Sequence, residues 1–102
     1  MKQLLSLGTD RPTAVFIASD VHASGPLSAL RQAGLRSPED VAIVAYDDLE
    51  LAEQFGYTTM RQPLHEMGVL AVGKLIYRME HPSAPPSHVR FLPKLVVRAT
   101  CG

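Results

Sequence analysis

The run Val41-Ala42-Ile43-Val44-Ala45-Tyr46-Asp47-Asp48 is continuously apolar and ends in two adjacent carboxylates. Such a run is typical of a strand buried on both faces of a parallel sheet. An earlier segment, Phe16-Ile17-Ala18-Ser19-Asp20, has the same pattern. In an open parallel sheet, the residues just past the carboxyl ends of the strands line the ligand crevice. We therefore expect a site rich in hydrogen-bond acceptors at one edge of a sheet.

The segment between these two strands predicts a helix, because its apolar residues recur at helical spacing at Ala23, Leu27, Leu30 and Ala33. Two strands joined by a helix of this length form a βαβ unit, which is almost always right-handed. Either residue 19 or residue 20 is a good N-cap for the helix. Pro26 inside it predicts a kink, or a start delayed to residue 24.

The rest of the chain predicts shorter elements. We expect the end of a helix at 1–7, strands at 13–18, 41–46 and 57–60, an irregular segment or short helical turn at 49–56, a helix from Pro63 to about Met79, and short strands at 89–92 and 94–98. The helix from Pro63 carries an apolar arc of about 160°, wider than the stripe of an ordinary surface helix.

Length and charge narrow the function classes. At 102 residues the chain is one domain at most. Its ten basic and ten acidic residues cancel, so no net positive field draws it to nucleic acid or to an anionic membrane. No run approaches the roughly 20 apolar residues of a membrane span. The single cysteine, Cys101, fits a reducing compartment. We expect a soluble, cytoplasmic chain with no membrane partner.

No residue set indicates an enzyme. The four histidines show no metal-binding spacing. The serines lie in no nucleophile elbow, and the glycines form neither a P-loop nor a dinucleotide-binding turn. The sequence therefore predicts no catalytic residue, no metal site and no cofactor.

The adjacent carboxylates Asp47 and Asp48 are the strongest ligand-binding candidates. They could hold Mg²⁺ as in a phospho-acceptor domain, but the further carboxylate and lysine of such a site are not apparent. A carboxylate also accepts paired hydrogen bonds from neighbouring sugar hydroxyls. We expect Asp47 to bind ligand and Asp48 to cap the turn or helix that follows it. Of Ser19 and Asp20, one caps its helix and the other could face the crevice.

Taken together, the motifs resemble the effector-binding domain of the lactose/galactose repressor (LacI/GalR) family of bacterial transcription regulators. The matching segments are Arg11-Pro12-Thr13-Ala14-Val15-Phe16, Ala18-Ser19-Asp20, Leu27–Leu35, Pro38-Glu39-Asp40-Val41, Tyr46-Asp47-Asp48, Thr58-Thr59-Met60-Arg61-Gln62-Pro63, Met67-Gly68 and Leu95-Val96-Val97-Arg98. Their order and spacing together are specific, and they span nearly the whole chain.

This resemblance implies an α/β fold, namely an incomplete three-layer parallel-sheet lobe of the periplasmic-binding-protein-like (type I) fold. Family members have an N-terminal DNA-binding domain and an effector domain of two similar lobes. By resemblance, residues 1–60 and about 94–102 belong to the C-terminal lobe. Residues from about 61 to 93 form a crossover and a helix that would pack on the N-terminal lobe, which this chain lacks.

The resemblance also assigns roles to individual residues. Asp47 matches the acidic residue that binds effector hydroxyls or amines, and Ser19 matches an effector-contacting position that is often Asn. Asp20 matches a helix-capping residue next to that position, and Gln62 lies near the pocket at the crossover. The segments His22–Ala33 and Leu49–Tyr57 match surfaces that pair two subunits, which predicts a homodimer.

The function implied is effector binding and dimerisation within a bacterial LacI-family regulator, with a sugar or small metabolite as effector and DNA contacted only through the missing N-terminal domain. The alternative is a fragment of a periplasmic-type sugar-binding protein that serves transport or chemosensing. In either case the apolar helix that starts at Pro63 needs a cover. We expect it to fold back on its own sheet or to be buried between subunits.

Overall fold

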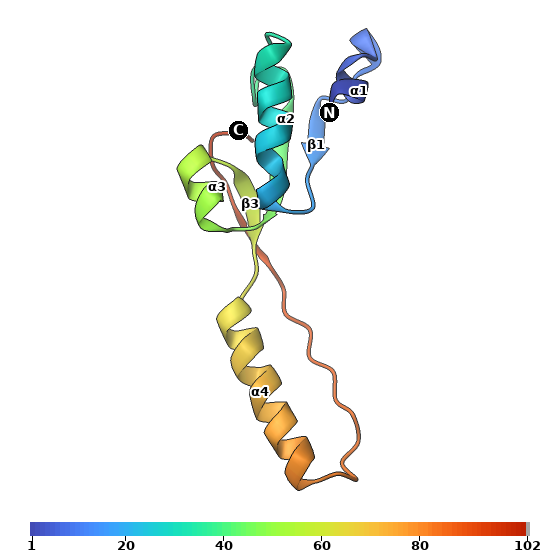
Figure 1. Cartoon of the computed structure of the whole chain (residues 1–102), viewed down its shortest axis with the longest axis vertical. Helices are drawn as coiled ribbons and strands as arrows, with labels where there is room; N and C mark the ends of the chain where they lie inside the picture. The colour runs from blue at the N-terminus through green and yellow to red at the C-terminus, as the bar shows by residue number, and fades with distance from the viewer. Residues whose placement is uncertain (102) are drawn as a thin grey trace. The chain divides into compact units, whose positions relative to one another are not determined.

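The computed structural model describes residues 1–101, which divide into two compact units. The first comprises Met1–Arg61 together with the chain from Lys94 onward, and the second comprises Gln62–Pro93. In chain order the elements are α1 (Lys2–Leu5), the 3₁₀ turn η1 (Gly8–Asp10), β1 (Ala14–Phe16), α2 (Asp20–Gln32), β2 (Ala42–Asp47), α3 (Glu50–Phe55), β3 (Thr58–Arg61), α4 (Leu64–Glu80) and β4 (Lys94–Val96) (Figure 1).

The first unit is built on a four-stranded sheet in the order β1-β2-β3-β4. The first three strands are parallel, and β4 runs antiparallel to β3. Val44 lies opposite both Phe16 and Thr58, so the three parallel strands end at the same edge. This mixed α/β architecture with an open, mainly parallel sheet confirms the predicted fold class.

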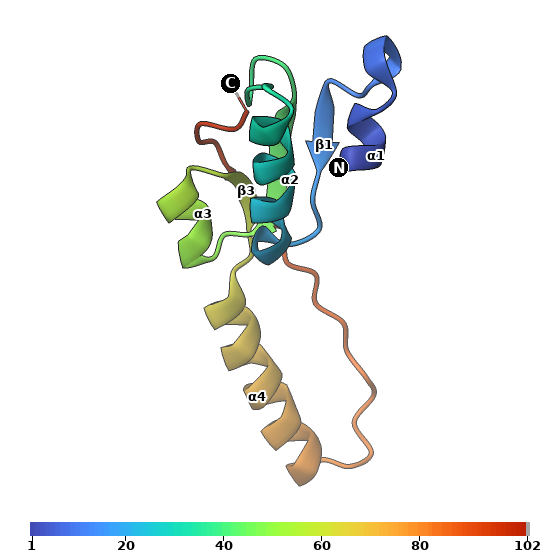
Figure 2. The ribbon, with the colours of Figure 1, turned by 45° about the horizontal axis from the view of Figure 1, so that its top comes forward.

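The hydrophobic core lies between the sheet and α2, which runs along one sheet face (Figure 2). Ile43 and Ala45 alternate along β2 toward this face and are fully buried, as are Ala23 and Leu30 of α2. Tyr57 closes the core beside α3. The alternation follows from the strand period of two, which places every second residue on the same face.

Strand β1 is less buried than the sequence suggests. The prediction was a strand at 13–18 covered on both faces, but the observed strand is only Ala14–Phe16, and both of those residues are exposed. Val15, between them, packs against the core. The expectation fails because β1 is an edge strand whose second face carries no helix among the described residues of the first unit. There the ring of Phe16 meets the ring of Tyr46 edge-on, with centroids 6.2 Å apart.

Helix α2 begins at Asp20 and continues through Pro26, so the predicted delay of its start to Ser24 is wrong. A proline removes one backbone donor and crowds the preceding turn. Here Ala23 and Leu30, on either side of Pro26, are both buried against the sheet. Tertiary packing of this face outweighs the local cost of the proline.

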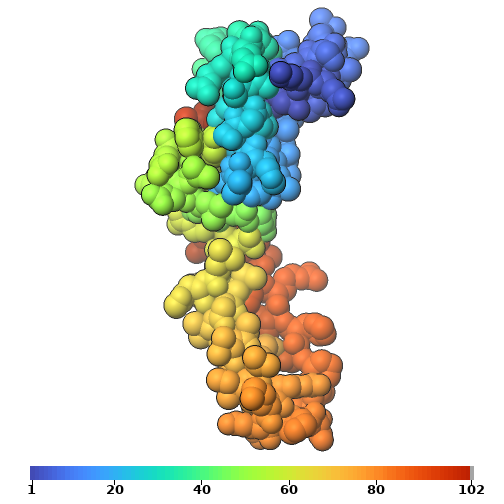
Figure 3. Space-filling model, in the orientation of Figure 1, coloured from blue at the N-terminus to red at the C-terminus, as the bar shows by residue number. Residues whose placement is uncertain are grey.

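The second unit consists of α4 and an extended return segment. Pro63 is the N-cap of α4 rather than its first helical residue, and the segment at 89–92, expected as a strand, is not one. It pairs with no other strand among the described residues. The return segment lies alongside α4 in the space-filling view (Figure 3). Lys74 of α4 holds this segment by donating from Nζ to the carbonyl oxygen of Ser87 at 3.2 Å.

Helix α4 buries none of its residues. Leu64, Leu75 and Ile76, which belong to its apolar arc, are 53%, 60% and 52% exposed. The expectation that this helix is covered, either by the chain's own sheet or between subunits, stays a prediction. Met67, Ala71 and Lys74 of the helix line a surface hollow together with residues 87–89 and 91 of the return segment.

The C-terminal tail is fastened to the sheet by Thr100, which is 4% exposed. Its hydroxyl donates to the carbonyl oxygen of Ile43 at 2.8 Å and accepts from the backbone N–H of Thr58 at 2.9 Å. Its own carbonyl accepts from the backbone N–H of Ile43 at 2.7 Å. One threonine thus satisfies backbone groups of both β2 and the start of β3.

Replacing Thr100 by valine should lower the free energy of unfolding by about 1–3 kcal/mol, because buried backbone groups of Ile43 and Thr58 lose their partner. The matched control is Thr100→Ser, which keeps the hydroxyl and should lose only the roughly 0.8 kcal/mol of one buried methyl group. Urea denaturation of the 102-residue chain measures both. Equal midpoints for the valine and serine variants would contradict the assigned role of the hydroxyl.

Candidate functional site

The carboxyl edge of the sheet gathers most of the predicted ligand-binding residues. Strands β1, β2 and β3 all end there, and α2 begins there. This places Ser19, Asp20 and Asp47 at one edge of the first unit. Gln62 directly follows β3 but belongs to the second unit.

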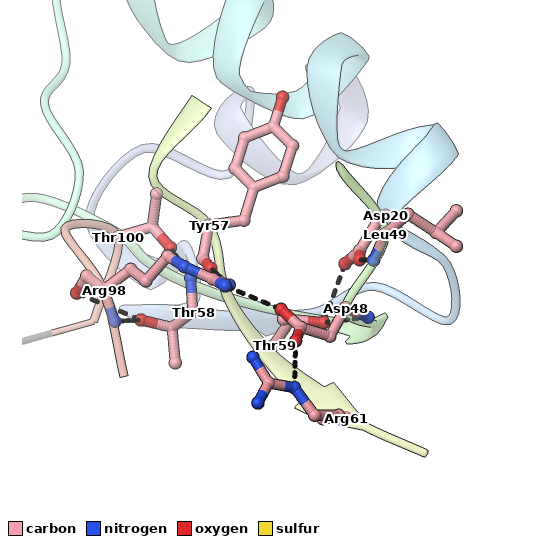
Figure 4. Close-up of polar contacts among 9 residues, drawn as sticks. All are labelled: Asp20, Asp48, Leu49, Tyr57, Thr58, Thr59, Arg61, Arg98 and Thr100. Atoms are coloured by element: carbon pink, nitrogen blue, oxygen red, sulfur yellow. Dashed lines mark hydrogen bonds and ion pairs between the residues drawn. The ribbon is translucent and has the colours of Figure 1, made fainter. Parts of the chain in front are cut away.

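Asp20 is fixed inside the protein, with only 1% of its surface exposed. One carboxylate oxygen, Oδ1, accepts from the hydroxyl of Thr59 at 2.7 Å, and Oδ2 accepts from the backbone N–H of Leu49 at 2.8 Å (Figure 4). The prediction that residue 19 or 20 is the N-cap of α2 is confirmed. Ser19 is the N-cap, and no side-chain hydrogen bond caps this helix. The Asp20 carboxylate instead serves the loop after β2.

That loop opens with two residues in an unusual backbone conformation. Asp47 has φ 111° and Asp48 has φ 59°, although neither is glycine. A side chain at such angles crowds its own backbone, at a cost of about 1–3 kcal/mol per residue, and persists only when the surroundings hold it. Part of the hold comes from Thr59, whose hydroxyl oxygen accepts from the backbone N–H of Asp48 at 3.3 Å.

The side chain of Asp48 lies between two arginines (Figure 4). Its Oδ1 is 2.7 Å from Nη2 of Arg98, and its Oδ2 is paired with Nε of Arg61. The Asp48 side chain is 5% exposed, that of Arg98 18% and that of Arg61 58%. The expectation that Asp48 caps the following helix is wrong, because the N-cap of α3 is Leu49 and no side-chain hydrogen bond caps it.

Arg98 is in turn anchored to β3. Its Nη1 donates to the carbonyl oxygen of Tyr57 at 2.9 Å, and its backbone N–H donates to the hydroxyl of Thr58 at 2.8 Å. The guanidinium therefore reaches Asp48 from a fixed backbone. Planar donors of this kind suit a carboxylate particularly well.

Two opposing effects set the pKa of Asp48. Burial by itself would raise the pKa of this carboxyl, because it disfavours the charged form. Hydrogen bonds from Arg61 and Arg98, and then the positive charges of both, outweigh burial and bring the pKa below its ordinary value of 3.8. Asp48 is thus ionised at neutral pH, and its buried carboxylate pairs with one partly buried and one exposed arginine.

Ser19 and Asp47 are both half-buried at this edge, so each keeps some surface that a ligand can reach. The sequence analysis missed Thr59, Arg61 and Arg98 as members of the site. A signal for Arg61 was present, since a basic residue at the end of β3 faces the paired carboxylates that end β2. For Arg98 no local signal existed, because it comes 50 residues after Asp48.

The chemistry of this edge suits a ligand rich in hydrogen-bond donors, because carboxylate and hydroxyl oxygens are acceptors. Across residues 1–101, no three histidine, cysteine, aspartate or glutamate side chains are grouped so as to hold a metal ion. In the same range, no helix has both the length and the apolar character to cross a bilayer.

A separate surface hollow of about 370 Å³ lies between α2, α3 and the C-terminal tail. Among its lining residues are Leu27, Arg31, Phe55 and Tyr57. It shares no residue with the carboxyl edge. We therefore do not assign it to the ligand site.

Comparisons with known proteins agree with this geometry. A family model described as a periplasmic binding protein-like domain matches residues 1–101. The ribose operon repressor of Escherichia coli K12 is 41% identical over 98% of this chain and 31% of its own length. The helix-turn-helix-type transcriptional repressor PurR of Vibrio vulnificus is 43% identical over 89% of this chain and 28% of its own length.

Among solved structures, a LacI family transcriptional regulator from Enterococcus faecium with bound ribose superposes with a TM-score of 0.81 at 27% identity. That match covers 98% of this chain and 38% of the other chain. The chain thus spans about a third of the length of the curated relatives it matches.

Lowering the pH should reduce the free energy of unfolding more for the wild-type chain than for the Asp48→Asn variant. The pKa of Asp48 is lowered in the folded state, so its ion pairs contribute their full stability above the unfolded-state pKa of about 3.8. That contribution is lost as the pH falls from there through the folded-state pKa. Urea denaturation at pH 7 and at steps down to pH 2.5 or so measures it.

The other carboxyl groups titrate in both proteins, so the difference in unfolding free energy isolates Asp48. This difference should be largest at neutral pH and should shrink below the ordinary pKa. A difference that stays constant over the acid range would contradict the lowered pKa.

Proposed function

Since the chain belongs to the periplasmic binding protein-like domain family and is related within it to LacI-family regulators, we propose that it is the effector-binding and dimerisation part of a bacterial transcriptional regulator of that kind. The family match confirms the LacI/GalR resemblance drawn from the motifs. The observation that carries the proposal is the placement of Asp47 on a tightly held turn at the carboxyl edge of a parallel sheet.

In this proposal Asp47 is the charged acceptor for effector hydroxyls or amines. Ser19, half-buried at the same edge, is a second contact, and Gln62 is a third at the crossover. Asp20 contributes through the turn rather than by touching the effector, because it is buried and both of its carboxylate oxygens already accept hydrogen bonds. The proposed function is ligand binding, with no catalytic residue in the site.

We propose a sugar, or a small metabolite of similar hydrogen-bonding character, as effector. The relatives named above include a ribose operon repressor and a regulator solved with bound ribose, which makes D-ribose the first compound to test. Neighbouring ring hydroxyls can donate together to one carboxylate.

The alternative, a sugar-binding protein for transport or chemosensing, has the weaker support because the curated relatives described above are named as repressors. A regulator acts in the cytoplasm, where its operator DNA lies. The gene sequence upstream of Met1 separates the two candidates. A helix-turn-helix there supports the regulator, and a signal peptide supports the binding protein.

We further propose that the first compact unit is most of a C-terminal lobe and that α4 packs on an N-terminal lobe. The exposed apolar arc of α4 supports this, since soluble monomers rarely leave a large apolar patch open. Val21 of α2 and Phe55 of α3 are 55% and 57% exposed, which supports homodimer pairing through these helices. Effector binding would then stabilise one closure of the two lobes and bias the DNA-binding geometry.

Changing Asp47 to Asn in the full-length regulator should weaken binding of D-ribose by about 10- to 100-fold. A hydrogen bond to a charged group contributes about 1.5–3 kcal/mol, and the amide removes the charge while keeping the size. Isothermal titration calorimetry measures the dissociation constant. Asp40→Asn is the matched control, because Asp40 pairs with Arg36, whose side chain is 74% exposed, away from this edge. An unchanged constant for Asp47→Asn would refute its assigned role.

The 102-residue chain by itself should not bind operator DNA specifically, because it has zero formal net charge and no recognition helix has been identified in it. An electrophoretic mobility shift at physiological salt, with the operator of the full-length regulator, tests this. A shifted band that survives excess non-specific DNA would show that DNA contacts lie within this chain.

A further inference from the structure

Asp48 lies in the same turn as Asp47, directly after it. The backbone conformation of these two residues is unusual. Two consecutive aspartates lie at positive φ, at 111° and 59°. Residues with a β-carbon adopt this region only when something holds them there. A helix-capping role for Asp48 does not explain the turn, because no side-chain hydrogen bond caps α3.

The contacts that hold the turn come from several parts of the first unit. Asp20 of α2 accepts from the backbone N–H of Leu49, and Thr59 of β3 accepts from that of Asp48. The Asp48 carboxylate forms ion pairs with Arg61 of β3 and with Arg98, which lies two residues after β4. The backbone and the side chain of the turn are therefore held separately, by hydrogen bonds and by ion pairs.

Arg61 lies at the point where the chain leaves the first unit, and Arg98 follows β4 after the chain has returned to that unit. Arg61 is the last residue before the Gln62–Pro93 unit, and β4, which leads to Arg98, begins where the chain returns at Lys94. Arg61 and Lys94 are directly paired between β3 and β4. A single carboxylate thus ties the turn to the last residue of β3 and to the segment after β4.

The exposed fractions of the two arginine side chains indicate which ion pair with Asp48 is the stronger. Arg98 is 18% exposed and Arg61 58%, so solvent screens the Arg61 pair more strongly. Loss of Asp48 has the largest effect of all, because it leaves two guanidinium groups near one another with no counter-charge. The expected order of effect is Asp48, then Arg98, then Arg61.

We propose that Asp48 is a positioning residue of the effector site: its ion pairs with Arg61 and Arg98 hold the left-handed turn that presents Asp47, and they fix that turn to the end of β3 and to the segment after β4. This rests on the proposed function only for the identity of what Asp47 binds. The hold on the turn is a property of the chain itself.

The first test needs no ligand. In the 102-residue chain, Asp48→Asn keeps the size of the side chain and removes its charge. Amide hydrogen exchange and HN–Hα couplings, measured by NMR at residues 47–49, report the turn. We expect protection of the amides of residues 48 and 49 to fall at least tenfold relative to the amides of β2, and the couplings at 47 and 48 to change. Asp40→Asn, which breaks the exposed pair with Arg36, is the control and should leave the turn as it is.

A general loss of stability gives a different result, because protection then falls by the same factor throughout the sheet. If Asp48→Asn does not fold, Arg98→Met and Arg98→Lys carry the test. The methionine variant should loosen the turn, and the lysine variant, which keeps the cation, should restore part of the protection. Unchanged amides and couplings in the variant that folds overturn the proposal.

The second test measures D-ribose affinity of the full-length regulator by calorimetry. Asp48→Asn and Arg98→Met should each weaken binding at least tenfold, with partial rescue by Arg98→Lys. A loosened turn with unchanged affinity overturns the positioning role. If the wild-type regulator binds no D-ribose, that result counts against ribose as effector, while the NMR result still decides whether Asp48 holds the turn.

Discussion

The ion pairs of Asp48 with Arg61 and Arg98 join three segments that are distant in sequence, namely the end of β2, the end of β3 and the chain just after β4. A buried charge is costly unless it is paired and hydrogen-bonded, so the buried Asp48 carboxylate depends on its two arginine partners. Because the carboxylate is nearly enclosed, this contact is screened little by solvent. The turn after β2 is therefore tied to β3 and to the chain after β4.

Carboxylates at this edge fall into two groups with different uses. Asp20 and Asp48 are turned inward and satisfy backbone or arginine donors of the protein itself. Asp47 is half-buried and keeps surface for a ligand. Preorganised acceptors of this kind reduce the ordering cost of binding, because their geometry is established before the ligand arrives. The inward-facing residues are thus as much a part of the proposed site as the residue that touches the effector.

Exposed apolar surfaces on the sheet and on α4 indicate where other parts of the regulator would pack. Phe16 of β1 and Leu95 of β4 are exposed on the sheet, and α4 exposes Leu75 and Ile76. Monomeric proteins rarely expose extended apolar surface, and the relatives named above are about three times as long as this chain. Both facts support the proposal that a second lobe and a second subunit cover these faces in the regulator.

Local patterns in the sequence were enough to predict the parallel strands, the βαβ unit and an acidic edge that includes Asp47, because hydrophobic periodicity and strand-end position are properties of neighbouring residues. Local patterns did not predict how much of β1 is buried, because the cover of an edge strand depends on elements that are distant in sequence. Local patterns also led to the wrong prediction that Asp48 caps the helix that follows it. Its partner Arg98 comes 50 residues later and is brought to it only by the antiparallel pairing of β4 with β3. Such long-range pairing is decided by tertiary structure, because the free energy that favours it comes from burial and charge complementarity across the assembled sheet.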